Sequence, residues 1–342
     1  MIRHNQPKLG AKELKNVKDA IINNNLSNKK IVKKFENKVC SLLKIKKGSA
    51  VACSSGSSAL FLAMKFLNPQ NYNVGIPIYT CKSLKNSLDL LKIKSEYIDN
   101  DKNSPNINLY QLKKLNLKYA IIPHTYGVPV NTVFLKKNKI KFIEDCSHSF
   151  GSSVNGKFLG LSGDIGIASF YTTKLITTGG HGGIIFSKNI KLIKKIRKFL
   201  DYDNPKNKNG FNLNMSDINA AIGLAQLDKL NKFKKKRQNI FKLYKKLPVK
   251  NIFSGLKDTN KLMIYRFVIL YSKPNKLKNF LKKRGISAIN PIEKKEMFNS
   301  KKKFYNCDSF CKKTLSLPIN NSIEIKDVKK IFKNVKLFLT KN

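Results

Sequence analysis

Residues 50–64 read Ala-Val-Ala-Cys-Ser-Ser-Gly-Ser-Ser-Ala-Leu-Phe-Leu-Ala-Met, and this stretch indicates the fold more directly than any other. The apolar run from Ala50 to Cys53 predicts a buried strand, and the apolar spacing from Ala59 to Phe66 predicts a helix soon after it. The serines and the glycine between the two segments are typical of a tight turn at a helix start. A buried strand that leads through a short turn into a helix predicts a sheet covered by helices.

The same alternation continues along the chain. Further short apolar runs lie at 74–78, 119–123, 140–144, 166–170 and 183–186. They predict an α/β fold, in which a large three-layer domain holds a mostly parallel sheet between helices. The pattern lapses around 247–259, and a predicted strand at 262–271, a helix at 276–283 and a strand at 285–289 follow. We therefore expect a large domain over residues 1–248, including an N-terminal helical segment, and a smaller C-terminal α+β domain over residues 249–342.

The charge of the chain is strongly positive, but it does not indicate a nucleic-acid partner. The sequence has 68 Lys+Arg against 20 Asp+Glu, a formal net charge of +48 at pH 7. Arginine supplies only five of these cations, and lysines spread along the chain supply the others. Proteins that read bases and phosphates rely on the planar guanidinium of arginine, which makes bidentate contacts. We therefore expect no nucleic-acid partner.

The cysteines and the N-terminus bear on the location of the protein. Six cysteines in 342 residues are too scattered for a disulfide framework, and Cys307 and Cys311 lack a second pair of ligands for a metal ion. The first ten residues, MIRHNQPKLG, contain no apolar signal core, and no stretch reaches membrane-spanning length. We expect a cytoplasmic protein with no metal site and no membrane insertion.

The serine-rich turn Ser54-Ser55-Gly56-Ser57-Ser58 is the first candidate for chemistry. A helix N-terminus offers unpaired backbone N–H groups and the positive end of the helix dipole, and serine hydroxyls add further donors. The turn is therefore suited to a phosphate group. A plain helix cap with a glycine turn is the alternative, and the spacing excludes a P-loop.

Two further candidates follow predicted strands. Asp145 ends an apolar strand, at the edge of a parallel sheet where ligands bind, and a carboxylate there can hold a ring nitrogen protonated or cap a helix. Lys174 follows the strand at 166–170 and precedes the glycine-rich stretch 179–183, which lets backbone approach a ligand closely. A lysine in such a place can form a Schiff base if the site lowers its pKa.

In their order and spacing these motifs resemble the PLP-dependent sugar aminotransferases of the DegT/StrS family, within the fold-type I aspartate aminotransferase superfamily. The resemblance runs from Pro7 to Pro318. The matching segments are Phe35-Glu36, Ser54 to Leu60, His124-Thr125-Tyr126-Gly127, Gly210 to Ser216 and Ala220-Ala221-Ile222-Gly223.

The resemblance implies roles for individual residues. Lys174 would hold pyridoxal 5′-phosphate (PLP) covalently and then act as a general base, and Asp145 would pair with the protonated ring nitrogen. The other cofactor-binding residues that it implies are Gly56, Ser57, Ser58, Tyr79, His148, Ser169 and Asn212. Among these, Asn212 would reach the phosphate in the neighbouring subunit, so the resemblance implies a homodimer with shared active sites.

The resemblance also implies a reaction. An amino acid, typically L-glutamate, would leave its amine on the cofactor, and the amine would pass to a keto carbon of a nucleotide-linked sugar for polysaccharide, LPS or related glycan biosynthesis. One alternative is a PLP/PMP-dependent sugar dehydratase, although relatives of that kind carry histidine in place of Lys174. The other alternative is a ligand-binding regulator on the same fold without turnover.

Overall fold

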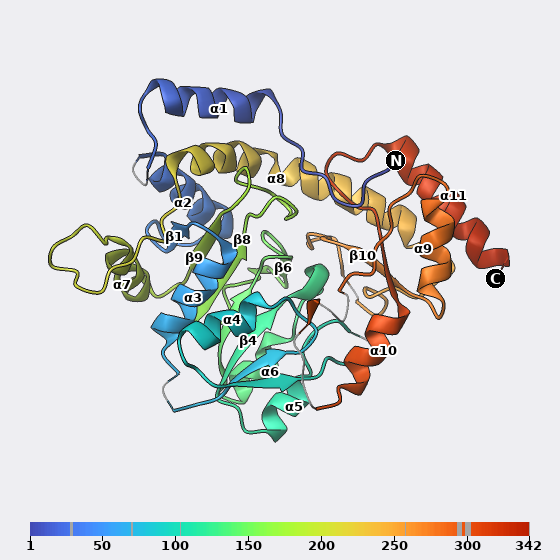
Figure 1. The fold of residues 1–342 in the computed structure, drawn as a ribbon, viewed down its shortest axis with the longest axis horizontal. Helices are drawn as coiled ribbons and strands as arrows, with labels where there is room; N and C mark the ends of the chain where they lie inside the picture. The colour runs from blue at the N-terminus through green and yellow to red at the C-terminus, as the bar shows by residue number, and fades with distance from the viewer. Residues whose placement is uncertain are drawn as a thin grey trace.

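The core of the fold is a seven-stranded sheet (Figure 1). Most of its neighbouring strands are parallel, as the sequence predicts. In this computed structural model we describe residues 1–27, 30–69, 71–102, 104–256, 258–292, 296–297 and 302–341. The sheet has the order β1-β9-β8-β5-β4-β2-β3, and β9 is the strand that runs antiparallel to its neighbours. Its strands are β1 (Ala50–Cys53), β2 (Val74–Pro77), β3 (Ser95–Ile98), β4 (Tyr119–Pro123), β5 (Lys141–Asp145), β8 (Ile165–Ser169) and β9 (Gly183–Phe186).

Alternate residues of these strands face two different helix layers. In β1, Val51 and Cys53 belong to the core shared with α3 (Gly56–Leu67), α4 (Ser83–Leu90) and α7 (Ile190–Leu200). Ala50 and Ala52 belong to the core on the opposite face, with α2 (Lys30–Leu43) and α8 (Asp217–Tyr244). Further along the sheet, α5 (Leu109–Lys114) and α6 (Thr132–Lys137) cover that second face. The three-layer α/β fold expected from the sequence is confirmed.

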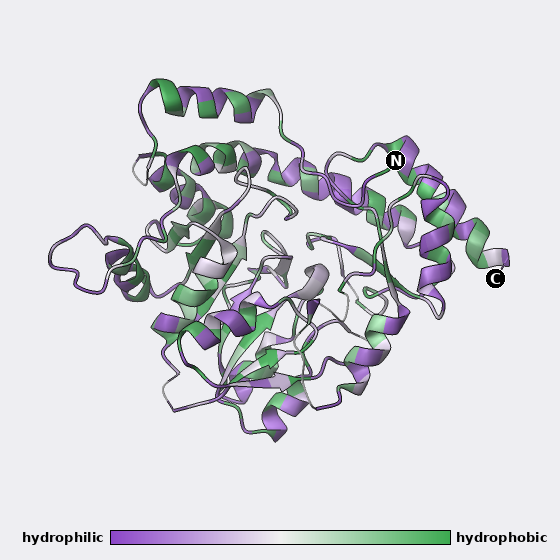
Figure 2. Ribbon diagram, in the orientation of Figure 1, coloured by the Kyte–Doolittle hydropathy of each residue, from purple (hydrophilic) through white to green (hydrophobic). Residues whose placement is uncertain are grey.

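The helices are amphipathic in the way their sequences predict. In α7 the buried residues are Ile193, Ile196 and Leu200, which follow the three- and four-residue spacing of one helix face. Figure 2 shows the strands of the large sheet as mainly hydrophobic and the helices as striped with both kinds of residue. The remaining helix of this part, α1 (Ala11–Ile22), packs on α8 (Figure 1).

A second, two-stranded sheet lies at the far end of α8. It pairs β10 (Phe267–Leu270) with β11 (Thr314–Leu317) in antiparallel fashion, beside α9 (Pro274–Lys282), α10 (Tyr305–Lys313) and α11 (Ile325–Lys341). A short hairpin of β6 (Ser153–Val154) and β7 (Lys157–Phe158) and a 3-10 turn, η1 (Thr125–Gly127), complete the described elements. We retain the division after residue 248 as a proposal, since it falls between the end of α8 and the start of β10.

The predicted strand at 262–271 is shorter in the structure, because its first half bonds elsewhere. The guanidinium of Arg237 donates to the carbonyls of Ile264 and Tyr265, and the carbonyl of Tyr126 accepts the backbone N–H of Tyr265 at 3.3 Å. These backbone groups are therefore unavailable to a neighbouring strand, and β10 begins at Phe267.

The segment 285–289, which the sequence predicts to be a strand, forms only isolated bridges and no continuous strand pairing. Ile286 forms an isolated bridge with Ile2, whereas Ile289 bridges Ser316 in β11. The two ends of the segment have different partners, so no continuous strand forms. Among the residues described, every helix is too short or too polar to span a bilayer.

The N-terminal segment carries a buried histidine. His4 is 5 % exposed; its Nε2 lies 2.9 Å from Ser316 Oγ, and its Nδ1 has no hydrogen-bond partner. Burial, together with the positive charge of Arg266, lowers the pKa of His4 from its ordinary 6.5 to about 3. The folded protein therefore keeps this imidazole neutral over a range in which the unfolded chain protonates it.

We predict that His4 makes the folded protein sensitive to acid. Below pH 6.5 the unfolded chain binds a proton that the folded chain accepts only near pH 3, so the free energy of unfolding falls as the pH drops through this window. At about pH 5 the loss from this residue amounts to about 2 kcal/mol. Urea unfolding at neutral pH and at about pH 5 should therefore show a smaller acid-induced loss in His4→Asn than in the unmodified protein. Equal losses in the two proteins would contradict the prediction.

Candidate active site

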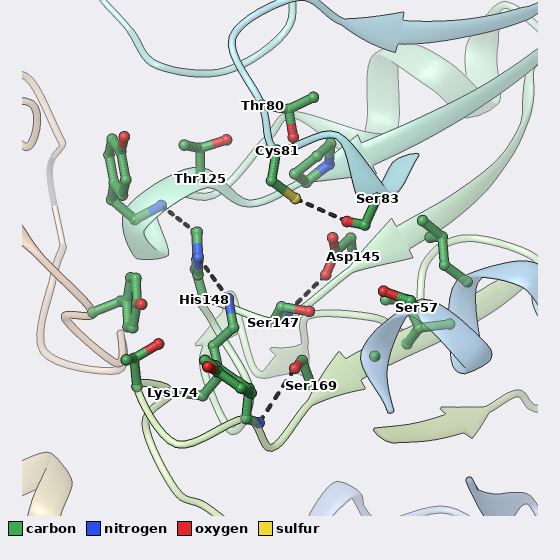
Figure 3. A pocket seen from close by; sticks show the side chains of 18 of the residues that line it. Ser57, Thr80, Cys81, Ser83, Thr125, Asp145, Ser147, His148, Ser169 and Lys174 are labelled. Carbon is green, nitrogen blue, oxygen red and sulfur yellow. Dashed lines mark hydrogen bonds between the residues drawn. The ribbon is translucent and has the colours of Figure 1, made fainter. Parts of the chain in front are cut away.

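A cavity of about 590 Å³ opens where the parallel strands of the large sheet end. This is the edge at which open α/β sheets bind their ligands, and the volume suits a small organic molecule. The predicted site residues that line it are Gly56, Ser57, Tyr79, Asp145, His148, Ser169 and Lys174. Figure 3 shows Lys174 and His148 pointing toward each other, with Asp145 and Ser57 on the other side of the cavity.

The N-terminus of α3 forms one wall of the cavity. Ser55 is the N-cap residue, and its side chain accepts the backbone N–H of Ser58 at 3.0 Å. At Gly56 a Cβ would lie 2.6 Å from the Cβ of Ser169, so only glycine allows the helix start to approach the end of β8 this closely. Ser57 is exposed and lines the cavity. The arrangement combines a helix N-terminus with hydroxyl groups and is suited to an anion such as phosphate.

Two predicted cofactor-binding residues lie outside this lining. The hydroxyl of Ser58 lies 2.8 Å from the hydroxyls of Ser54 and Ser55, which is the arrangement of a helix cap. Asn212 is exposed and its side-chain oxygen accepts the backbone N–H of Asn214 at 3.3 Å. The resemblance places Asn212 in the active site of a second subunit, and that role stays a prediction.

Asp145 ends β5 and faces the cavity. Its Oδ1 accepts the backbone N–H of Ser147 at 2.8 Å, and its backbone carbonyl accepts the N–H of His124 at 3.1 Å. These contacts hold the carboxylate at the strand end, where a ligand in the cavity can meet it.

The neighbouring carboxylate, that of Glu144, is fully buried. It accepts the backbone N–H groups of Gly160, Ser162 and Gly163, at 3.0, 2.7 and 2.6 Å, and lies 2.9 Å from His124 Nε2. His124 Nδ1 accepts a backbone N–H, so its Nε2 carries the proton and donates to Glu144. Burial alone would raise the pKa of Glu144, but the bonds from His124 and from the backbone outweigh it and hold this pKa below its ordinary value.

His148 contacts Lys174 and also two tyrosines that line the cavity, Tyr126 and Tyr265. Its Nε2 lies 3.1 Å from Lys174 Nζ, and its Nδ1 accepts the backbone N–H of Tyr126 at 3.3 Å. Its ring stacks on that of Tyr265, with centroids 4.1 Å apart and planes 9° apart. Burial, followed by the positive charges of Lys174 and Arg266, lowers the pKa of His148 well below its ordinary range, so the ring is neutral.

The backbone beside His148 adopts an uncommon conformation. Tyr126 has φ of 58° and Gly127 has φ of 94°, and both angles are in the left-handed region. A Cβ on Gly127 would lie 2.4 Å from the carbonyl of Met263, so the turn requires glycine there. A strained tyrosine at the wall of a cavity is typical of a functional site, and here it directs a backbone N–H toward His148.

No site role is predicted from the sequence for Tyr126, Tyr265 or Arg266, although all three line the cavity and Tyr126 belongs to the matching segment 124–127. The positive φ of Tyr126 has no signature in its residue type. Tyr265 and Arg266 fall within a predicted strand, and the charge of the arginine inside an apolar run was the available signal.

Tyr79 and Cys81 follow β2 in the chain, and both line the cavity. Tyr79 is fully buried; its ring packs edge-on against Tyr126 and Phe310, and its hydroxyl lies 2.9 Å from that of Tyr126. Cys81 is an exposed thiol at the cavity wall. Within the ranges that the structure describes, no cluster of three or more His, Cys, Asp or Glu side chains could hold a metal ion.

Known proteins resemble this chain in sequence and in fold. The profile of the DegT/DnrJ/EryC1/StrS aminotransferase family matches residues 7–336. The chain is 29 % identical to a Campylobacter jejuni UDP-4-amino-4,6-dideoxy-N-acetyl-beta-L-altrosamine transaminase, over 96 % of this chain and 95 % of that one. It is 30 % identical to GDP-perosamine synthase of Escherichia coli O157:H7, over 70 % of each chain. Its fold matches that of Helicobacter pylori PseC, an aminotransferase involved in the biosynthesis of pseudaminic acid, with a TM-score of 0.89, 23 % identity and complete coverage of both chains.

We predict that the bonds of Glu144 are a major source of stability. Glu144→Gln replaces an oxygen that accepts backbone N–H groups with an amide nitrogen that cannot accept them, and leaves those donors buried. Urea unfolding should show a loss of about 3 kcal/mol in the free energy of unfolding.

Glu96→Gln is the matched control, because Glu96 pairs with the exposed Lys302 at the surface. It should change the free energy of unfolding by less than about 1 kcal/mol. If both variants lost the same small amount, Glu144 would have no special structural role.

Proposed function

Because the chain belongs to the DegT/DnrJ/EryC1/StrS aminotransferase family, we propose that it is a PLP-dependent enzyme that transfers an amino group to a keto carbon of a nucleotide-linked sugar. L-Glutamate is the amino donor in this proposal, and the product serves polysaccharide, LPS or related glycan biosynthesis. The names of its relatives, which include transaminases of UDP-linked sugars and a GDP-perosamine synthase, support this substrate class. The cytoplasmic location expected from the sequence remains part of the proposal.

One observation carries the proposal: a lysine, a carboxylate and a helix N-terminus meet in one cavity. PLP has three groups to hold, namely a carbonyl carbon, a ring nitrogen and a phosphate. Lys174 matches the first, Asp145 the second, and the N-terminus of α3 with Ser57 and Ser169 the third. The close approach at Gly56 leaves backbone and hydroxyl donors where a Cβ would otherwise intrude. The residues present therefore fit the cofactor.

When bound, PLP supplies an electron sink for the negative charge left when a proton leaves the Cα of the amino donor. The chain provides the groups around it. Lys174 would bind the cofactor covalently and, once displaced by the donor, accept that proton at Nζ. Asp145 would hold the proton on the ring nitrogen, because its negative charge favours the protonated ring. The neutral His148 would orient Lys174 through its Nε2.

Two further elements complete the proposal. Asn212 would contact the phosphate in a second subunit, so the enzyme would work as a homodimer with shared active sites. Lys174 also separates transamination from dehydration, because the resemblance associates sugar dehydratases with histidine at this position.

We predict that Lys174 gives the protein its cofactor spectrum. Purified protein mixed with PLP should develop an absorbance band that free PLP lacks, since the bond to Nζ changes the conjugated system. L-Glutamate should abolish the band, and a keto nucleotide sugar added afterwards should restore it. Lys174→Ala should lack the band, whereas the exposed control Lys188→Ala should behave like the unmodified protein. Absence of the band in the unmodified protein would refute a PLP enzyme, and a band unaffected by every amino donor would refute transamination.

We also predict that Ser57 and Ser58 differ in their contribution to cofactor binding. Ser57→Ala removes a hydroxyl at the cavity wall and should raise the Kd for PLP roughly tenfold, the effect of one hydrogen bond to a charged group. Ser58→Ala removes a hydroxyl of the helix cap and should lower the free energy of unfolding by about 1 kcal/mol, with little change in the Kd. Fluorescence titration with PLP and urea unfolding test the two effects. A rise in the Kd for Ser58→Ala that matches that of Ser57→Ala would show that both hydroxyls contact the phosphate.

A further inference from the structure

Helix α10 takes its N-terminal cap from a distant part of the chain. Its own N-cap residue, Phe304, offers no side-chain acceptor for the unpaired N–H groups of the first turn. Asp99, which follows β3 at the edge of the large sheet, accepts two of them. Its Oδ2 accepts the N–H of Asn306 at 3.0 Å, and its Oδ1 accepts the N–H of Cys307 at 2.8 Å. The carboxylate also meets the positive end of the helix dipole.

Two further contacts hold the start of α10 at the same sheet edge. The side-chain amide of Asn306 donates to the backbone carbonyl of Asn100 at 2.9 Å. The ring of Phe304 packs edge-on against that of Tyr97 in β3, with centroids 6.4 Å apart. In sequence α10 belongs to the proposed C-terminal domain, but its first turn is fixed to the large sheet, apart from α9 and α11 (Figure 1).

The next turn of α10 reaches the back of the active-site cavity. The ring of Phe310 packs edge-on against that of Tyr79, with centroids 5.2 Å apart, and Tyr79 lines the cavity. The hydroxyl of Tyr79 lies 2.9 Å from that of Tyr126, whose backbone N–H donates to His148. Because Phe310 lies about one turn beyond the capped N–H groups, a displacement of the helix start also displaces this ring.

We propose that Asp99 is a positioning residue of the active site, which holds α10 where Phe310 supports Tyr79 at the cavity wall. This inference rests on the proposed function, because it expects an effect on the binding of PLP. Asp99 lies outside the cavity lining, so it acts through α10 and does not touch the cofactor or a substrate. A cap that only stabilised the helix would change the free energy of unfolding and leave PLP binding by the folded protein unchanged.

The first test measures PLP binding in two variants of Asp99 by fluorescence titration. Asp99→Ala leaves two N–H groups of α10 without their acceptor and should raise the Kd for PLP about tenfold, the lower end of the effect of losing a charged hydrogen bond. Asp99→Asn keeps one acceptor oxygen, and asparagine is a good helix cap, so this variant should recover part of the affinity.

Phe310→Leu tests the route from the cap to the cavity. It removes the ring that contacts Tyr79 and leaves the cap in place, so it should also raise the Kd for PLP. If Asp99 acts through this ring, Asp99→Ala combined with Phe310→Leu should bind PLP about as weakly as the weaker single variant. Independent effects would multiply, and that result would overturn the proposed route.

Asp327→Ala is the matched control. Asp327 lies in the first turn of α11, which packs on α8 and α9, so the variant removes a carboxylate from a helix start outside the cavity. It should leave the Kd for PLP unchanged. Urea unfolding of each variant shows whether it has folded, and Asp99→Asn decides the question if Asp99→Ala does not fold.

An unchanged Kd in the folded Asp99 variants would show that the cap serves stability alone, and the proposal would be wrong. If the unmodified protein binds no PLP, the proposed function fails, and a second measurement still tests the cap. The sequence contains no tryptophan, so the near-ultraviolet circular dichroism of the protein comes mainly from its tyrosines. This signal should change in Asp99→Ala and not in Asp327→Ala, and equal spectra for all three proteins would contradict a role of Asp99 in placing Tyr79.

Discussion

The buried carboxylate of Glu144 is the constraint on which the active site depends. It fastens the end of β5 to the loop at 160–163 and, through His124, to the turn η1. That turn carries Tyr126, whose backbone N–H holds the imidazole of His148, and His148 in turn lies against Lys174. Two sets of hydrogen bonds, joined by the backbone of residues 124–126, therefore connect the interior of the sheet with Lys174. Asp145, the next residue along β5, projects into the cavity from the strand that Glu144 fixes.

The site also needs a contribution from outside the large sheet. Tyr265 and Arg266 come from the segment before β10, and they line the same cavity as the strand ends. The side chain of Arg237 in α8 holds this segment by its backbone carbonyls. This bonding stops the predicted strand short and leaves Tyr265 and Arg266 in irregular backbone beside the cavity.

The sequence predicts the features that depend on residues close together in the chain. Apolar runs and helical spacing predict the strands of the large sheet and its helices, and Asp145, Ser57 and Lys174 are predicted as site residues because each lies at or just after the end of a predicted strand. Tyr265 and Arg266 could not be found in this way, because their place depends on contacts with α8 and η1 that lie far away in the chain. The left-handed backbone of Tyr126 likewise results from packing. The role that the resemblance predicts for Asn212, contact with the phosphate in a second subunit, depends on residues outside this chain.

The hydrogen bonds of Arg237 also anchor the backbone next to the cavity. One helix, α8, packs on the large sheet and at its other end binds the carbonyls of residues 264, 265 and 319. One helix therefore contacts both the large sheet and the segment that carries Tyr265 and Arg266. Groups that are held in place before a ligand arrives lose little further freedom on binding, so this anchoring favours affinity. Discrimination among sugars would then depend on the residues that this anchoring places at the cavity wall and on their chemistry.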